Sequence, residues 1–358
     1  MNNKLIKKYV WKDEEIKTHK EDGDCRLATF LGLVRYYKAD VTINELFGLG
    51  CGLDFTLMDV PAGSVNILGV TGRNFEVEKN FCEKINITIK ESISTYKPKR
   101  FWDKPFDYEI LSEVANGRPV VVNTDIYYMD YLSDKNLPHN RYHCIMILGY
   151  DLKAKTLQVV DAMTDKIETL QMSSLNKGIH QQGKFMMEEG LWYVIKDNNG
   201  MIKEIPKSMY IDSLIEQSKY MLSDDGPISQ IKDFYEFLQR TYNKAIKSED
   251  NKYKNYLTMQ VSTICSLIRT EDEVSGTFYR RLYLRFVQRF IEKFEIKNEN
   301  MDKIVEMLTE DAGEWKKIAF KVRYTKDILE QTKKLIEVLE KIYNLEKNIF
   351  ELILKENL

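Results

Sequence analysis

The hydrophobic pattern of the chain changes near residue 205, and this change constrains the fold more than any other feature. Before it, short runs rich in β-branched residues alternate with helical patterns, as in residues 120–122 behind the Gly117-Arg118-Pro119 turn. After it, apolar residues recur at helical spacing, with Lys and Glu between them. The pattern predicts an α+β domain over residues 1–204, followed by an all-α domain of four to six helices over residues 205–358.

The composition narrows the class of protein. With 358 residues and 43% hydrophobic content, the chain is long enough to bury one large core or two ordinary ones. The 53 basic and 55 acidic residues nearly balance, so neither nucleic acid nor an anionic membrane surface is expected as the main partner. Residues 1–11 are rich in lysine but lack the apolar stretch of a signal peptide, and we expect a soluble, cytoplasmic protein.

The cysteine content is also typical of a cytoplasmic protein with reduced thiols. The chain has five cysteines, an odd number without a CxxC pair, which argues against a disulfide framework and against a zinc site. No metal is expected. An isolated buried cysteine is most often a core residue, and this is the interpretation for Cys51, Cys82 and Cys265.

Cys25 stands apart because it directly precedes an apolar run with helical spacing. Asp24 is suited to cap the start of this helix, which would place the thiol in the first turn. Unpaired backbone N–H groups and the positive end of the helix dipole favour a thiolate there. Since the thiolate is the reactive form of cysteine, Cys25 is the candidate nucleophile.

Two further residues complete a candidate catalytic triad. His143 opens the apolar strand of residues 143–150, and Asp161 closes the next apolar run, residues 157–161. A short polar turn between these runs predicts a β-hairpin, whose strands can bring His143 and Asp161 together at one sheet edge. A lone histidine or a strand-end aspartate usually has a structural role. The hypothesis depends on all three residues in an order typical of papain-like sites, with His143 as base and Asp161 as its orienting partner.

Other candidate binding residues carry weaker signals. The backbone N–H of Cys25 is the first candidate oxyanion donor, and His19, six residues upstream, could supply a second from its imidazole. His19 could equally be an exposed residue of a charged loop. Tyr127 and Tyr128 belong to an aromatic stretch that either faces substrate or packs a loop, and the sequence favours neither. His139 and His180 are interpreted as surface residues.

Several motifs in order resemble a known family. They are Asp24-Cys25 before the helix, the glycine-rich residues 44–53, residues 117–122, and His143 followed by residues 148–151. Together they resemble the BtrH-like N-terminal domain, named after the acyltransferase of butirosin biosynthesis, over about residues 20–200. Residues 276–283, with Trp315, look like the helical domain that often follows it. The resemblance implies a papain-like cysteine-protease fold, in which the catalytic helix packs on an antiparallel sheet.

The resemblance also implies an activity. Relatives transfer an acyl chain from a carrier-protein thioester to an amine, forming an amide in natural-product biosynthesis. The acyl donor would be the phosphopantetheine arm of an acyl or peptidyl carrier protein, and the enzyme would bind no cofactor of its own. By this resemblance, Cys25 is the acylated residue, His143 the general base and Asp161 its orienter. The Lys-, Asn- and Ile-rich chain is expected to be close to the amide-forming enzyme of closthioamide biosynthesis.

Two other functions fit the same residues. A cysteine hydrolase, either a peptidase or a thioesterase, would use the same triad with water as the acceptor. A binding module without catalytic activity would make the three residues incidental. His19 also departs from the glutamine common in papain-like peptidases, so the sequence leaves the second oxyanion donor open.

Overall fold

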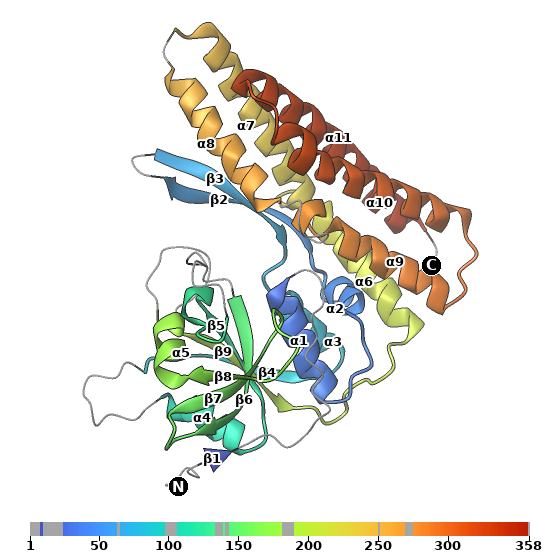
Figure 1. Cartoon of the computed structure of the whole chain (residues 1–358). Helices are drawn as coiled ribbons and strands as arrows, with labels where there is room; N and C mark the ends of the chain where they lie inside the picture. The colour runs from blue at the N-terminus through green and yellow to red at the C-terminus, as the bar shows by residue number, and fades with distance from the viewer. Residues whose placement is uncertain are drawn as a thin grey trace. The chain divides into compact units, whose positions relative to one another are not determined.

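The computed structural model describes residues 8–9, 24–62, 65–96, 106–132, 139, 143–180, 190–249, 251–268 and 275–356 (Figure 1). The chain divides into two compact units. We call Met1–Thr42 with Ile85–Glu204 the sheet unit, and Ile43–Lys84 with Ile205–Leu358 the helical unit. The sequence-based domains 1–204 and 205–358 remain a prediction. The two compact units and the two sequence-based domains have the same boundary after residue 204. They differ in residues 43–84, which belong to the same unit as the later helices.

The sheet unit is built on an antiparallel sheet with the strand order β4-β9-β5-β6-β7-β8. Strand β1 also pairs with β6. Every pairing in the described part of this sheet is antiparallel. The α+β prediction for the N-terminal region is thereby confirmed. The strands are β1 (Lys8–Tyr9), β4 (Thr88–Ile93), β5 (Val120–Thr124), β6 (His143–Asp151), β7 (Thr156–Asp161), β8 (Glu168–Gln171) and β9 (Leu191–Asp197).

Helices cover both faces of the central strands. The helices are α1 (Cys25–Tyr36), α4 (Tyr108–Ala115) and α5 (Met172–Ile179), with the short 3-10 helix η1 (Ile126–Tyr128). Successive strand residues point to opposite faces of a sheet. Ile145 packs in one core with residues of α4 and α5, while its neighbour on β6, Met146, lies beside Gly32 of α1. The Thr29 hydroxyl also donates to the Cys144 carbonyl at 3.1 Å, which ties α1 to β6.

In its described residues after 205, the helical unit contains six long helices, the upper end of the predicted four to six, and it also includes an earlier segment of the chain. The helices are α2 (Ile43–Leu49), α3 (Val77–Lys84), α6 (Lys207–Met221), α7 (Pro227–Lys247), α8 (Lys252–Leu267), α9 (Arg280–Lys293), α10 (Glu299–Lys317) and α11 (Ile328–Lys355), with η2 (Ser275–Thr277) and η3 (Ile318–Val322). The helical prediction for this region is confirmed. None of the helices in the described ranges is long and apolar enough to cross a membrane.

A strand pair that the sequence analysis did not anticipate belongs to the helical unit. Strands β2 (Leu53–Ala62) and β3 (Val65–Arg73) pair in antiparallel fashion. Two helix glutamines bind this pair through its backbone: Gln230 accepts from the Leu57 N–H at 2.8 Å, and Gln260 accepts from the Leu68 N–H at 2.8 Å. These hydrogen bonds satisfy strand groups that would otherwise be unpaired. The strand pair therefore depends on helices α7 and α8 for its structure.

A buried ion pair organises the core of the helical unit. Arg280 is 0% exposed and Glu346 is 1% exposed. They form a bidentate ion pair, in which Nε of Arg280 donates to Oε1 of Glu346 at 2.9 Å and Nη2 donates to Oε2 at 3.1 Å. The indole N–H of Trp315 donates to the same carboxylate at 3.0 Å, and the guanidinium lies 4.6 Å from the Trp315 ring. Arg280 also donates to the backbone carbonyl of Asp54 at 2.9 Å. The motif of residues 276–283 and Trp315 is therefore a structural core element.

Close packing of α2 on α9 requires a glycine. A Cβ atom at Gly48 would lie only 2.1 Å from Cγ of Phe286, well inside van der Waals contact. Part of the glycine-rich segment of residues 44–53 is thus explained by packing within the helical unit, since only glycine lets the Phe286 ring approach so closely.

Candidate active site

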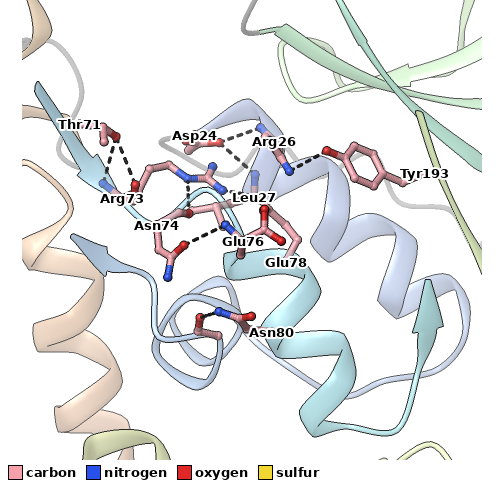
Figure 2. Close-up of polar contacts among 11 residues, drawn as sticks. Asp24, Arg26, Leu27, Thr71, Arg73, Asn74, Glu76, Glu78, Asn80 and Tyr193 are labelled. Atoms are coloured by element: carbon pink, nitrogen blue, oxygen red, sulfur yellow. Dashed lines mark hydrogen bonds and ion pairs between the residues drawn. The ribbon is translucent and has the colours of Figure 1, made fainter. Parts of the chain in front are cut away.

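The first turn of α1 presents Cys25 as the sequence predicts. Asp24 is in an extended conformation, and its Oδ1 accepts hydrogen bonds from the backbone N–H groups of Arg26 at 2.9 Å and Leu27 at 3.0 Å (Figure 2). The predicted N-cap is confirmed. Cys25 is partly exposed, whereas Cys82, Cys144 and Cys265 are buried. A thiol at this position is accessible and lies at the positive end of the helix dipole.

Arg26 fixes the orientation of this helix start. Its side chain is 8% exposed, and its Nη2 donates to the Tyr193 hydroxyl of β9 at 2.9 Å (Figure 2). The guanidinium carbon also lies 5.2 Å from the centre of the Tyr193 ring. Phe30, one turn later, packs edge-on against the same ring at 5.3 Å. Together these contacts hold the first turn of α1 against the sheet, so the position of the thiol is defined.

His143 and Asp161 meet across the hairpin formed by β6 and β7. The Nε2 atom of His143 lies 2.7 Å from Oδ2 of Asp161, and the two side chains are 3% and 0% exposed. Asp161 pairs in register with Ile145, two residues beyond His143, so both functional side chains occupy the same face. The predicted hairpin and the predicted meeting of the two side chains are both present.

Three donors hold the Asp161 carboxylate. Besides His143, the Tyr131 hydroxyl donates to Oδ2 at 2.5 Å, and the Met163 N–H donates to Oδ1 at 2.9 Å. Burial by itself would raise the pKa of Asp161, but the hydrogen bonds from His143, Tyr131 and Met163 outweigh it and lower that pKa. Burial and the neighbouring carboxylate raise the pKa of Tyr131, which therefore remains a donor. Asp161 is ionised at neutral pH.

The charge of His143 follows from its two partners. Burial by itself would lower the pKa of His143, but hydrogen bonds with Asp161 and Cys25, and the negative charges of both, raise it to about 10. Because Nε2 faces Asp161, Nδ1 is the ring nitrogen left for the sulfur. The structure thus brings the predicted Cys25, His143 and Asp161 together as one connected group.

The remaining predicted residues have different positions. Tyr127 and Tyr128 lie on η1, directly after β5, and Tyr127 is 50% exposed while Tyr128 is half-buried. His19 lies outside the described residues. The hydroxyl of Tyr131, a partner of Asp161, is a further site residue that the sequence patterns do not indicate. Its position within an aromatic stretch was visible, but no spacing rule connects it to a carboxylate 30 residues away.

The ionisation of this group predicts a pH-dependent contribution to stability. The His143 pKa is raised from 6.5 to about 10, so its contribution is complete below pH 6.5 and is lost as pH rises toward 10. The lowered pKa of Asp161 gives a contribution that is lost as pH falls below about 4. Replacing Asp161 with asparagine should therefore cost most, about 3 kcal/mol, between roughly pH 4 and 6.5.

Thermal unfolding of the wild type and the Asp161→Asn variant, followed by circular dichroism across this pH range, measures the effect. The Asp151→Asn variant, at a partly exposed position, serves as a control, because the lowered pKa of Asp151 predicts a change only in acid. A difference between wild type and Asp161→Asn that stays constant from pH 5.5 to about pH 10 would contradict the assigned charges.

These observations define the sheet unit as an α+β structure whose first helix carries a cysteine beside a histidine–aspartate pair. Residues 24–162 of the chain match the family model described as butirosin biosynthesis protein H, N-terminal. The match begins at the N-cap of α1 and ends just after Asp161, so it includes all three residues. The match confirms the resemblance for this segment, which is less than half of the chain. It gives no support for a link to the closthioamide enzyme in particular. No curated protein matches the chain.

Proposed function

We propose that this protein is an acyltransferase of natural-product biosynthesis that carries its acyl group on Cys25 and delivers it to an amine. The observation that carries the proposal is the connected group of Cys25, His143 and Asp161, which lies within the segment that matches the butirosin family model. A papain-like arrangement of helix and sheet is part of the proposal. The proposed acyl transfer includes amide formation of the kind found in closthioamide biosynthesis.

In the first half-reaction, Cys25 takes the acyl group from a thioester. The raised pKa of His143 makes it an imidazolium at neutral pH, and the sulfur reacts with the thioester as a thiolate paired with this cation. This thiolate attacks the thioester carbonyl carbon. A new carbon–sulfur bond forms, the bond to the donor sulfur breaks, and His143 gives its proton to the leaving thiolate. Exchange between two thiols of similar pKa costs little free energy. The backbone N–H of Cys25 is available to the oxyanion, and His19 stays a candidate second donor.

In the second half-reaction, an amine attacks the acyl-enzyme. His143, now neutral, accepts a proton from the attacking nitrogen, and Asp161 stabilises the imidazolium that forms. The carbon–nitrogen bond forms and the Cys25 thiolate leaves. Water would compete with the amine, so the site must favour the amine by position or by excluding water. The donor is the phosphopantetheine arm of a carrier protein, the acceptor is a small amine, and no bound cofactor is needed.

Mass spectrometry of the intact protein tests this proposal. The enzyme is mixed with acyl thioesters of N-acetylcysteamine, which imitate the end of the phosphopantetheine arm. We expect a mass increase equal to one acyl group, located on Cys25 by peptide mapping, and its conversion to an amide when a primary amine is added. Release of free acid alone in the presence of amine would support the hydrolase instead. An alkylatable Cys25 that accepts no acyl group from any thioester tested would count against both.

A further inference from the structure

A second histidine–carboxylate pair lies in the sheet unit, outside the triad. Asp125 directly follows β5 and is 0% exposed, and its Oδ2 lies 2.8 Å from Nδ1 of His139. The His139 side chain is 50% exposed. Its ring stacks on Tyr127, with the ring centres 4.1 Å apart and an angle of 28° between the planes. A buried carboxylate thus holds an imidazole that solvent and ligands can reach.

This second pair lies at the same end of the sheet as the triad. Thr124, the last residue of β5, pairs directly with His143, the first residue of β6. Neighbouring strands are about 4.8 Å apart. The backbone of Asp125, the residue after Thr124, is therefore close to the backbone of His143. His139 and His143 are therefore presented at the same end of the paired strands β5 and β6, where the chain enters β6.

The position of Asp125 is fixed by backbone contacts. Its N–H donates to the Gly178 carbonyl at 3.2 Å, and its Oδ1 accepts from the Tyr127 N–H at 3.1 Å. A Cβ atom at Gly178 would lie 2.2 Å from Oγ1 of Thr124, so only glycine permits this approach of α5 to the end of β5. With Nδ1 of His139 donating to the carboxylate, the other ring nitrogen, Nε2, becomes the proton acceptor.

For an amine that binds as its ammonium ion, amide formation needs two proton acceptors, and this requirement rests on the proposed function. A basic primary amine is protonated at neutral pH and has no lone pair with which to attack. It must lose one proton before the attack and another during it. His143 can accept the second of these protons, but a neutral His143 that had already accepted the first would be unable to do so.

We propose that His139 is the base that removes the first proton from a primary-amine acceptor, with Asp125 as its positioning residue. The ammonium group gives a proton to Nε2 of His139, the ring nitrogen that does not face Asp125. The neutral nitrogen then attacks the acyl carbon on Cys25. The carbon–nitrogen bond forms, the carbon–sulfur bond breaks, the second proton passes to His143, and His139 releases its proton to solvent.

Two amines of different basicity test this inference in the His139→Gln variant. n-Butylamine is almost fully protonated at neutral pH, whereas hydroxylamine is mostly unprotonated. Acylation of Cys25 by an N-acetylcysteamine thioester should stay within about 2-fold of wild type, since His139 takes no part in it. Transfer to butylamine should fall by about 100-fold, the usual size of a general-base contribution, while transfer to hydroxylamine should stay unchanged.

The pH profile and a matched pair of aspartates separate this role from a structural one. The loss with butylamine should shrink as pH approaches the amine's own pKa, where free amine becomes abundant. Asp125→Asn should give the same selective loss, while Asp130→Asn, an exposed position in the same segment, should not. An equal loss with both amines, or an unchanged rate with butylamine, overturns the role of His139 alone. A wild type that forms no acyl-enzyme overturns the proposed function, and this inference with it.

Discussion

Replacing Cys25 with alanine is expected to reduce acyl transfer by about 10⁴-fold or more, the scale seen when a covalent nucleophile is removed. The acyl group would have no sulfur to bind, and the remaining groups could only orient the substrates. The fold should persist, because the cap of α1 is made by the Asp24 side chain and backbone N–H groups, not by the thiol. Product formation measured by chromatography, with thermal unfolding as a check on structure, gives the result.

Cys51 provides the matched control, because it is the other partly exposed cysteine. Burial raises the pKa of Cys51 to about 11, although Lys84 nearby opposes this effect. The thiol is therefore protonated at neutral pH and should react slowly. We expect iodoacetamide to label Cys25 first in the wild type, and Cys51→Ala to retain transfer activity. A Cys25→Ala variant with normal activity would eliminate both the transferase and the hydrolase mechanisms.

Replacing Glu346 with alanine should destabilise the helical unit by about 3–5 kcal/mol, the usual cost of breaking a buried ion pair from one side. Arg280 would stay buried without either hydrogen bond to the Glu346 carboxylate, and the Trp315 N–H would lose its acceptor. Denaturant unfolding followed by tryptophan fluorescence and circular dichroism measures the change.

Glu337→Ala on the same helix is the control, since Glu337 is exposed and its ion pair with Lys333, one turn away, is long at 3.9 Å. Its effect should stay within about 0.5 kcal/mol. Glu346→Gln should fall between the two, because the amide oxygen can still accept hydrogen bonds while the charge is lost. If Glu346→Ala and Glu337→Ala unfold at the same denaturant concentration, the ion pair does not hold this core together.

Local rules explain which parts of the structure could be predicted. The cap of α1 involves only residues 24–27, and its geometry follows from an aspartate before an apolar helix. The hairpin of β6 and β7 joins two adjacent apolar runs through a short turn. For this reason the positions of Cys25, His143 and Asp161 followed from the sequence. Their catalytic roles remain a proposal.

Contacts between distant segments could not be predicted in the same way. The polar partners of β2 and β3 are Gln230 and Gln260, which lie far along the chain, and no periodic pattern marks such pairs. The same holds for the hydrogen bond from Tyr131 to Asp161. The loop-like sequence context of His139 predicts a surface residue. Its half-exposed ring agrees with that, but the buried carboxylate beneath it gives no signal in the sequence.

The helical unit is assembled from two stretches of chain, and this has a consequence for synthesis on the ribosome. Residues 43–84 emerge long before the helices after residue 205 that complete their core. Until then the apolar side chains of β2 and β3 lack their final partners, and an isolated pair of strands is barely stable in water. The nascent chain must therefore keep this segment from associating with other chains while the sheet unit is still being made. Chaperone binding to residues 53–73 during translation would be the expected sign of that interval.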